Sequence, residues 1–218
     1  EFRIRTSIRE LEGERRVEKA ALGRAGSIHI LSLRKKYQQL SRLNPRVRIL
    51  EPEISVDGSK VEFRYLKGIT LAERLGQGIR DGKAPVEDIK AGLAFLYDVP
   101  EDQIVPFAVT PEFTDIFGTV PDLEDFSYKV SNIDGLFENL MITEMDGREQ
   151  LYCLDYEWVF DFPVPARFVQ YRNLAYFYYK YQGLMSYSSL EEFLQEFGIG
   201  SGLASVYASM EASFQSYV

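Results

Sequence analysis

The sequence has 218 residues, of which 45% are hydrophobic, and a formal net charge of −8. This length and apolar share suffice for a globular protein of one or two domains, and the acidic balance argues against a nucleic-acid binder. A single histidine, His29, and a single cysteine, Cys153, exclude an internal disulfide, a cysteine-based zinc site and any site that needs two histidines. No stretch reaches the roughly 20 apolar residues of a membrane span.

The start of the chain carries no recognisable targeting signal, so we expect a cytoplasmic protein. The sequence opens at Glu1, without a methionine and within a strand-like pattern. We therefore expect it to be a fragment of a longer protein or a trimmed piece of one.

A hairpin of two strands is predicted first. Residues 2–8 alternate apolar and polar side chains, which is the period of a strand. Residues 11–14 supply a turn, and 15–22 read as the second strand.

An amphipathic helix is predicted next, over residues 26–43. Its apolar residues recur at near-helical spacing, and Asn44 followed by proline ends the pattern. The basic run 34–36 is interpreted as a solvated face, and His29 as a residue that packs or caps within its helix.

The middle of the chain alternates further strands and helices. Asp57-Gly58 is a tight-turn signal, and Thr70 with Glu73 three residues later resembles a capped helix start. The predicted elements here are strands over 46–54 and 60–65 and helices that begin at Thr70 and span 85–97.

The rest of the chain divides into an irregular part, a short hairpin and a helical end. These are 98–129, rich in Pro, Phe, Thr and Asp; the strands 140–143 and 150–154 around a turn at 145–148; and helices from Pro165, broken near 186–188 and 198–202. Strands and a helix followed by a mostly helical half predict a two-lobed α+β architecture.

A short loop carries the residue types that phosphoryl transfer needs. That chemistry requires a carboxylate near the acceptor hydroxyl, oxygen ligands for Mg²⁺ and a cation for the phosphates. Asp134 and Asn139 are five residues apart, the spacing of a kinase catalytic loop, and Asp155 ends the apolar run that follows. Cys153, inside that run, is expected to be a buried structural thiol.

The Asp134–Asn139 pair, followed by Asp155-Tyr156-Glu157, resembles the aminoglycoside phosphotransferase and choline kinase branch of the protein-kinase-like fold. Upstream, Lys19 resembles the phosphate-contacting lysine of that fold. The segment 63–71 resembles the hinge between its lobes, and the order of these motifs matches.

The resemblance implies an ATP- and Mg²⁺-dependent kinase of two lobes. Residues 1–66 would form a reduced or truncated nucleotide-binding β lobe, and residues 67–218 a mainly helical catalytic lobe. It implies Asp134 as the catalytic base, Asn139, Asp155 and Glu157 at the metal, Lys19 on the phosphates, and Phe63, Arg64, Tyr65 and Leu66 around the adenine.

The segment 154–165 also resembles kinase-like modules of bacterial surface-glycan assembly proteins. That resemblance implies a hydroxyl of a small molecule or glycan as acceptor. It also implies other glycan-assembly modules fused to this chain or associated with it.

Three departures from the pattern keep other functions open. Asn132 stands where a histidine is common, no Gly-rich phosphate loop is present, and the helix 26–43 holds no acid to pair with Lys19. One alternative is therefore a catalytically inactive kinase-like domain that acts as an interaction module. Another is an unrelated α+β protein in which Asp134 and Asn139 are ordinary turn residues.

Overall fold

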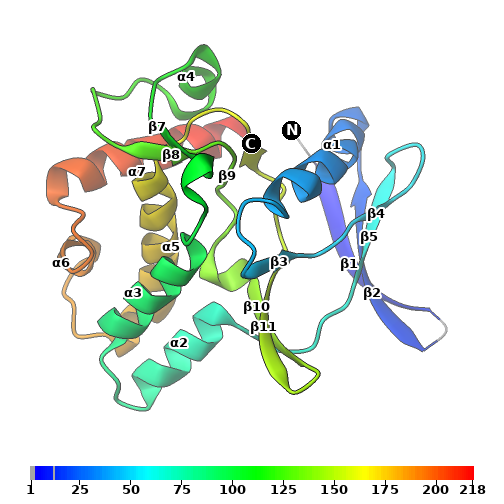
Figure 1. Ribbon diagram of the computed structural model, residues 1–218, viewed down its shortest axis with the longest axis horizontal. Helices are drawn as coiled ribbons and strands as arrows, with labels where there is room; N and C mark the ends of the chain where they lie inside the picture. The colour runs from blue at the N-terminus through cyan, green and yellow to red at the C-terminus, as the bar shows by residue number, and fades with distance from the viewer. Residues whose placement is uncertain (1–2, 12) are drawn as a thin grey trace.

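The computed structural model describes residues 3–11 and 13–218. Figure 1 shows a sheet with one helix on the right and a group of helices on the left. The right-hand part is called the sheet lobe and the left-hand part the helical lobe. The predicted first strand begins on Phe2 and the predicted first turn includes Glu12, and both residues lie outside the described ones.

The sheet lobe is a four-stranded antiparallel sheet with the order β1-β2-β5-β4. Its strands are β1 (Ile4–Leu11), β2 (Glu14–Ala21), β4 (Glu53–Ile54) and β5 (Lys60–Arg64). The predicted hairpin over residues 2–22 is confirmed in its described part, with Thr6 of β1 opposite Lys19 of β2.

Helix α1 (Arg24–Leu40) packs on this sheet through its apolar stripe. Ile30 and Leu33 are buried with Val61 of β5 in the same core. The helix begins close to the sheet because Gly26 lacks a side chain: a Cβ there would lie 2.8 Å from the Arg3 carbonyl oxygen. It also ends three residues earlier than predicted.

A second sheet lies between the two lobes (Figure 1) and has the order β3-β11-β10-β6. Its strands are β3 (Val47–Ile49), β6 (Ile69–Thr70), β10 (Leu140–Met145) and β11 (Arg148–Cys153). The predicted hairpin is confirmed as β10 and β11. Asp146 and Gly147 in its turn have φ of 54° and 70°, as a two-residue hairpin turn requires.

The single strand predicted over 46–54 is wrong. Its first part is β3, which pairs in parallel with β11, whereas its last part is β4 in the other sheet. The Leu50 N–H still bonds the Cys153 carbonyl at 3.2 Å. Pro52 follows and has no N–H for a ladder, so the chain crosses from one sheet to the other at that point.

The helical lobe holds the remaining helices. They are α2 (Leu71–Arg80), α3 (Pro85–Leu96), α4 (Pro111–Phe117), α5 (Ala166–Tyr181), α6 (Leu190–Gln195) and α7 (Ser201–Tyr217), with 3₁₀ turns η1 (Glu101–Gln103), η2 (Phe137–Asn139) and η3 (Gln182–Leu184). The capped helix start at Thr70 is confirmed, because Thr70 and Glu73 each bond the other's backbone. The predicted breaks near 186–188 and 198–202 separate η3, α6 and α7.

The irregular segment predicted over 98–129 is wrong in part. It contains η1, α4 and the antiparallel strands β7 (Ile104–Pro106) and β8 (Phe126–Tyr128). Thr110 caps α4 by accepting from the Phe113 N–H at 3.2 Å, and proline follows at the first helical position. That threonine–proline start signal was present in the sequence.

Helix α5 is the centre of the helical lobe and is buried along most of its length. Phe168 and Phe177 are almost inaccessible, and the ring of Phe168 lies 5.8 Å from that of Tyr207 of α7, at a tilt of 55°. The fold is thus α+β with two lobes, as predicted from the sequence. The division at residue 66 stays a prediction, since β3 also joins the chain before it to the second sheet. Every described helix is too short or too polar to cross a bilayer.

Candidate active site

Lys19 reaches from the sheet lobe to the segment after β11. It lies on β2 between β1 and β5, and the residue is only 8% exposed. Its Nζ is 3.0 Å from Oδ2 of Asp155 and 2.5 Å from Oε1 of Glu157. Burial opposes the charged form, but the two carboxylates outweigh it and raise the pKa of Lys19. Lys19 is therefore a fixed cation at the junction of the lobes.

Asp155 offers one oxygen that the protein does not use. Its Oδ2 accepts from Lys19, whereas its Oδ1 is buried without a hydrogen-bond partner among the described residues. A buried carboxylate oxygen without a partner is costly. Such an atom fits a cation that arrives with a ligand, as Mg²⁺ does with a nucleotide.

Asn139 and Asp155 both carry oxygens of the kind that Mg²⁺ binds. Asn139 donates its amide N–H to the Asp134 carbonyl at 2.9 Å, and that bond fixes which side of the amide its oxygen presents. Within the part of the chain that the structure describes, no cluster of three His, Cys, Asp or Glu side chains could hold a metal alone. Mg²⁺ on a nucleotide needs no such cage, because it takes one or two protein oxygens together with phosphates and water.

Asp134 is held in a short loop between β9 (Ser131–Asn132) and η2. Its backbone N–H bonds Oδ1 of Asn132 at 3.1 Å, and its Oδ2 accepts from the Trp158 N–H at 2.7 Å. The asparagine that stands in place of a histidine therefore supports the loop as a hydrogen-bond acceptor. Trp158 precedes β12 (Val159–Phe160), which pairs with β9 and ties the two segments together.

The surroundings of Asp134 tune it toward proton transfer. Burial, and then the charge of Asp155, raises its pKa to about 7, against the Trp158 N–H and Arg172, which lower it. A base works best when its pKa lies near the working pH. Asp134 is therefore suited to accept a proton near neutrality.

Two residues of α5, which the sequence analysis did not single out, bond the backbone of the loop that carries Asp134. Asn173 accepts from the Phe137 N–H at 2.8 Å and donates to the Gly135 carbonyl at 3.0 Å. Arg172 donates to the Ile133 carbonyl at 2.8 Å. Both side chains are buried. The available signal was two adjacent polar residues placed directly between Tyr171 and Leu174 in a mainly apolar helix.

Helix α1 contributes His29 to the site, whereas the kinase-like pattern has an acidic residue on this helix that pairs with the lysine. His29 is buried, as predicted, with its Nε2 3.9 Å from Oε2 of Glu157 and its ring 5.0 Å from that of Trp158. Burial, Lys36 and Lys19 lower the pKa of His29 to about 4, so the imidazole is neutral. The carboxylates that pair with Lys19 come instead from Asp155 and Glu157, in the segment after β11.

The prediction that residues 34–36 form a solvated face is wrong for Lys36. Arg34 and Lys35 are exposed, but Lys36 is half-buried and its Nζ donates to the Glu157 carbonyl. Position on the helix explains the difference, because Lys36 lies on the side of α1 that faces the helical lobe. Lys36 is a further residue that sequence reasoning missed.

The segment expected to hold adenine spans the end of β5 and the two residues after it. Phe63 is buried in the core and meets Tyr156 edge-on, with the ring centroids 6.2 Å apart. The Tyr65 N–H is taken by the Arg15 carbonyl at 3.3 Å. Leu66 is half-buried, and its backbone makes no hydrogen bond among the described residues. Leu66 thus has the backbone groups that a base could use.

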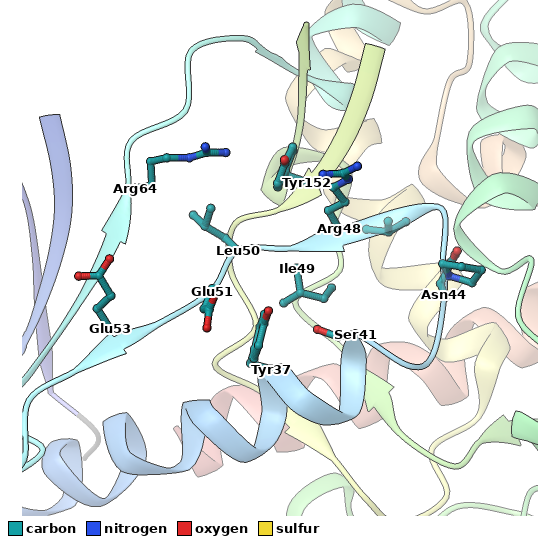
Figure 2. A pocket seen from close by; sticks show the side chains of 12 residues that line it. Tyr37, Ser41, Asn44, Arg48, Ile49, Leu50, Glu51, Glu53, Arg64 and Tyr152 are labelled. Atoms are coloured by element: carbon teal, nitrogen blue, oxygen red, sulfur yellow. The ribbon is translucent and has the colours of Figure 1, made fainter. Parts of the chain in front are cut away.

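Arg64 points elsewhere. Its guanidinium and that of Arg48 each lie 6.0 Å from the centre of the Tyr152 ring. These residues line a cavity of about 520 Å³ beside β3 and the end of α1 (Figure 2). Glu51 and Glu53 line the same cavity. With two positive and two negative side chains, the cavity favours neither an anionic nor a cationic ligand. The loop that carries Asp134 does not line this cavity.

Comparison with known proteins gives only distant likenesses. No protein-family model matches the chain, and no curated protein sequence matches it. Similar solved structures include WaaP in complex with acyl carrier protein, which has 14% identity and a TM-score of 0.46 over 98% of this chain and 84% of that one. An apo macrolide 2′-phosphotransferase from Brachybacterium faecium has 13% identity and a TM-score of 0.46 over 96% and 80%.

A thermostable mutant of an aminoglycoside phosphotransferase in its apo form matches at 11% identity and a TM-score of 0.42, over 99% of this chain and 95% of that one. The type of protein that the sequence resembles is thus represented among these structures. The assignment of a function rests on the geometry of Lys19, Asp134 and Asp155.

Proposed function

We propose that this chain is an ATP- and Mg²⁺-dependent phosphotransferase that acts on a hydroxyl of a small molecule or glycan. The observation that carries the proposal is the cation Lys19 beside Asp155, whose Oδ1 is buried and unused, close to an aspartate whose pKa is about 7. This combination would supply phosphate charge neutralisation, a metal-binding oxygen and a base.

In the proposed reaction, Asp134 accepts the proton of the acceptor hydroxyl while the hydroxyl oxygen forms a bond to the γ-phosphorus of ATP. The bond from that phosphorus to the bridging oxygen breaks, and ADP leaves with the electron pair. Asn132 and the Trp158 N–H hold Asp134 in place, and Lys19 neutralises the phosphates that remain on the nucleotide.

The metal would be held by Asn139 and Asp155, with Glu157 beside them, and when bound it would offset the charge of the phosphates. Glu157 already accepts from Lys19, which anchors that lysine at the lobe junction. Phe63 and Leu66 would enclose the adenine. The cytoplasm, which supplies ATP, is the compartment that this proposal requires.

One observation favours a second candidate, an inactive kinase-like interaction module. Both carboxylates beside the metal position are already bonded to Lys19. If those ion pairs outcompete a nucleotide and its metal, the site stays closed and the fold serves only to bind a partner, such as another glycan-assembly module.

Transfer of labelled phosphate separates the two candidates. The chain is incubated with γ-labelled ATP, Mg²⁺ and pools of small hydroxyl compounds and oligosaccharides, and the label in the acceptor is measured. We expect transfer by the wild type and none by Asp134→Asn. If the wild type binds ATP with Mg²⁺ but never labels an acceptor above the level of Asp134→Asn, the interaction module is the better account.

A further inference from the structure

A second lysine enters the candidate active site from helix α1. Lys36 Nζ donates to the carbonyl oxygen of Glu157, and the N–H of the same peptide group, from Trp158, is bonded by Asp134 at 2.7 Å. The peptide group between Glu157 and Trp158 thus accepts from Lys36 through its carbonyl oxygen and donates to Asp134, the candidate base, through its N–H. The ammonium of Lys36 therefore lies across this peptide group from Asp134, within range of the charges of Asp134, Glu157 and Asp155.

Lys36 differs from the other lysines of this region in its partner. Lys19 has two carboxylates, and Lys35, the next residue on α1, pairs with Asp161 at 2.7 Å. Within residues 3–11 and 13–218, Lys36 has no ion pair and bonds only a neutral carbonyl, although its side chain is half-buried.

Such an arrangement is costly without an anion. A half-buried ammonium loses hydration that a single carbonyl does not replace, and burial accordingly lowers the pKa of Lys36 to about 8 despite the nearby carboxylates. The site therefore holds a cation whose favourable partner would be an anionic ligand.

The positions of Lys19 and Lys36 indicate which anionic group each lysine would bind. Lys19 lies beside Asp155 and Glu157, where the proposed nucleotide phosphates would be held. Lys36 bonds the backbone of Glu157 rather than its carboxylate, and the charge that acts on it most strongly is that of Asp134, beside which the acceptor hydroxyl would be placed. The group that must pass between nucleotide and acceptor is the γ-phosphoryl group, and its oxygens carry the charge of the transition state.

We propose that Lys36 is a second phosphate-binding cation, which contacts the γ-phosphoryl group of the bound nucleotide and stays on it during transfer. This inference rests on the proposed function. It assigns Lys19 to the phosphates that leave with ADP and Lys36 to the phosphoryl group that is transferred. The affinity for ATP over ADP is then set by Lys36.

The test compares two nucleotides in two neighbouring variants. Dissociation constants for ADP and for a non-hydrolysable ATP analogue, each with Mg²⁺, are measured by calorimetry for the wild type, Lys36→Met and the matched control Lys35→Met. Lys35 is 69% exposed on its side chain and bonds a surface aspartate. Lys36→Arg, which keeps the charge, is measured beside them.

We expect Lys36→Met to bind the ATP analogue about 10- to 100-fold more weakly, the range for one lost hydrogen bond to a charged group, and ADP within about threefold of the wild type. Lys35→Met should leave both constants unchanged, and Lys36→Arg should retain most of the preference for the ATP analogue. If Lys36→Met does not unfold cooperatively, Lys36→Gln replaces it in the comparison.

Equal loss of both nucleotides in Lys36→Met would overturn the inference, because it would show that Lys36 only docks α1 against the helical lobe. No loss of either nucleotide would overturn it as well. If the wild type itself binds neither nucleotide, the proposed function fails first, and the inference fails with it.

Discussion

Two glycines in α2 give a matched test of how this helix packs against α5. A Cβ at Gly76 would lie 2.3 Å from Cε1 and 2.5 Å from Cζ of Tyr181, whereas a Cβ at Gly78 meets nothing closer than 3.8 Å. Tyr181 is 4% exposed, and its ring centroid lies 4.8 Å from that of Phe177. The ring is thus confined and cannot turn away at little cost.

The magnitude follows from two opposing effects. Alanine in place of glycine within a helix is favourable by about 0.5–1 kcal/mol, and both variants share that gain. Overpacking a core costs about 1–3 kcal/mol. We therefore expect Gly76→Ala to be about 1–3 kcal/mol less stable than Gly78→Ala, while Gly78→Ala is more stable than the wild type by about 0.5–1 kcal/mol.

Urea unfolding followed by circular dichroism measures both variants against the wild type. In a thermal scan the difference between the variants corresponds to roughly 2–12 °C. The reasoning is refuted if Gly76→Ala stabilises the chain as much as Gly78→Ala does, since α2 and α5 would then be further apart than the structure places them.

Three further predictions concern the site and its support. Asn173→Ala leaves buried backbone groups of the loop unpaired, so it should lower the free energy of unfolding by at least about 1–3 kcal/mol. The control Gln170→Ala, on the same helix, should change that free energy by less than about 0.5 kcal/mol. Similar values for the two variants in urea titrations would contradict the loop-supporting role of Asn173. Cys153 is 2% exposed, and burial raises the pKa of its thiol. A thiol reagent at pH 8 should therefore label Cys153 only after the protein is unfolded in urea. Rapid labelling of the native protein would show that β11 is misplaced. Because Asp134 accepts a proton only when ionised and its pKa is about 7, phosphate transfer should rise between pH 6 and pH 8. A rate that stays flat across this range would show that Asp134 is not the base.

The candidate site could be predicted from the sequence where its signals are local. The five-residue spacing of Asp134 and Asn139 and the hairpin before Asp155 are set by neighbouring residues, so the pattern survives in the fold. The place of Lys19 could be predicted only from the order of motifs. The structure gives the physical reason for that order, because β2 presents Lys19 to the segment after β11.

What could not be predicted depends on contacts between distant segments. Lys36 reads as one of three surface cations, and only the docking of α1 against the helical lobe shows which of them turns inward. Asn173 is buried by packing that its own helix does not encode. The crossing of the chain between two sheets near Pro52 is likewise fixed by the pairing of β3 with β11, a strand about 100 residues later.

The central claim is that Lys19 and Asp155 form a site for a nucleotide with its metal. It is tested most directly by the melting temperature of the chain with ATP and Mg²⁺, with ATP alone and without ligand, for the wild type and for Asp155→Ala. A ligand that binds only the native state raises the melting temperature by mass action. We predict a rise in the wild type that requires Mg²⁺ and disappears in Asp155→Ala; no rise in the wild type at millimolar ATP and Mg²⁺ would contradict the account.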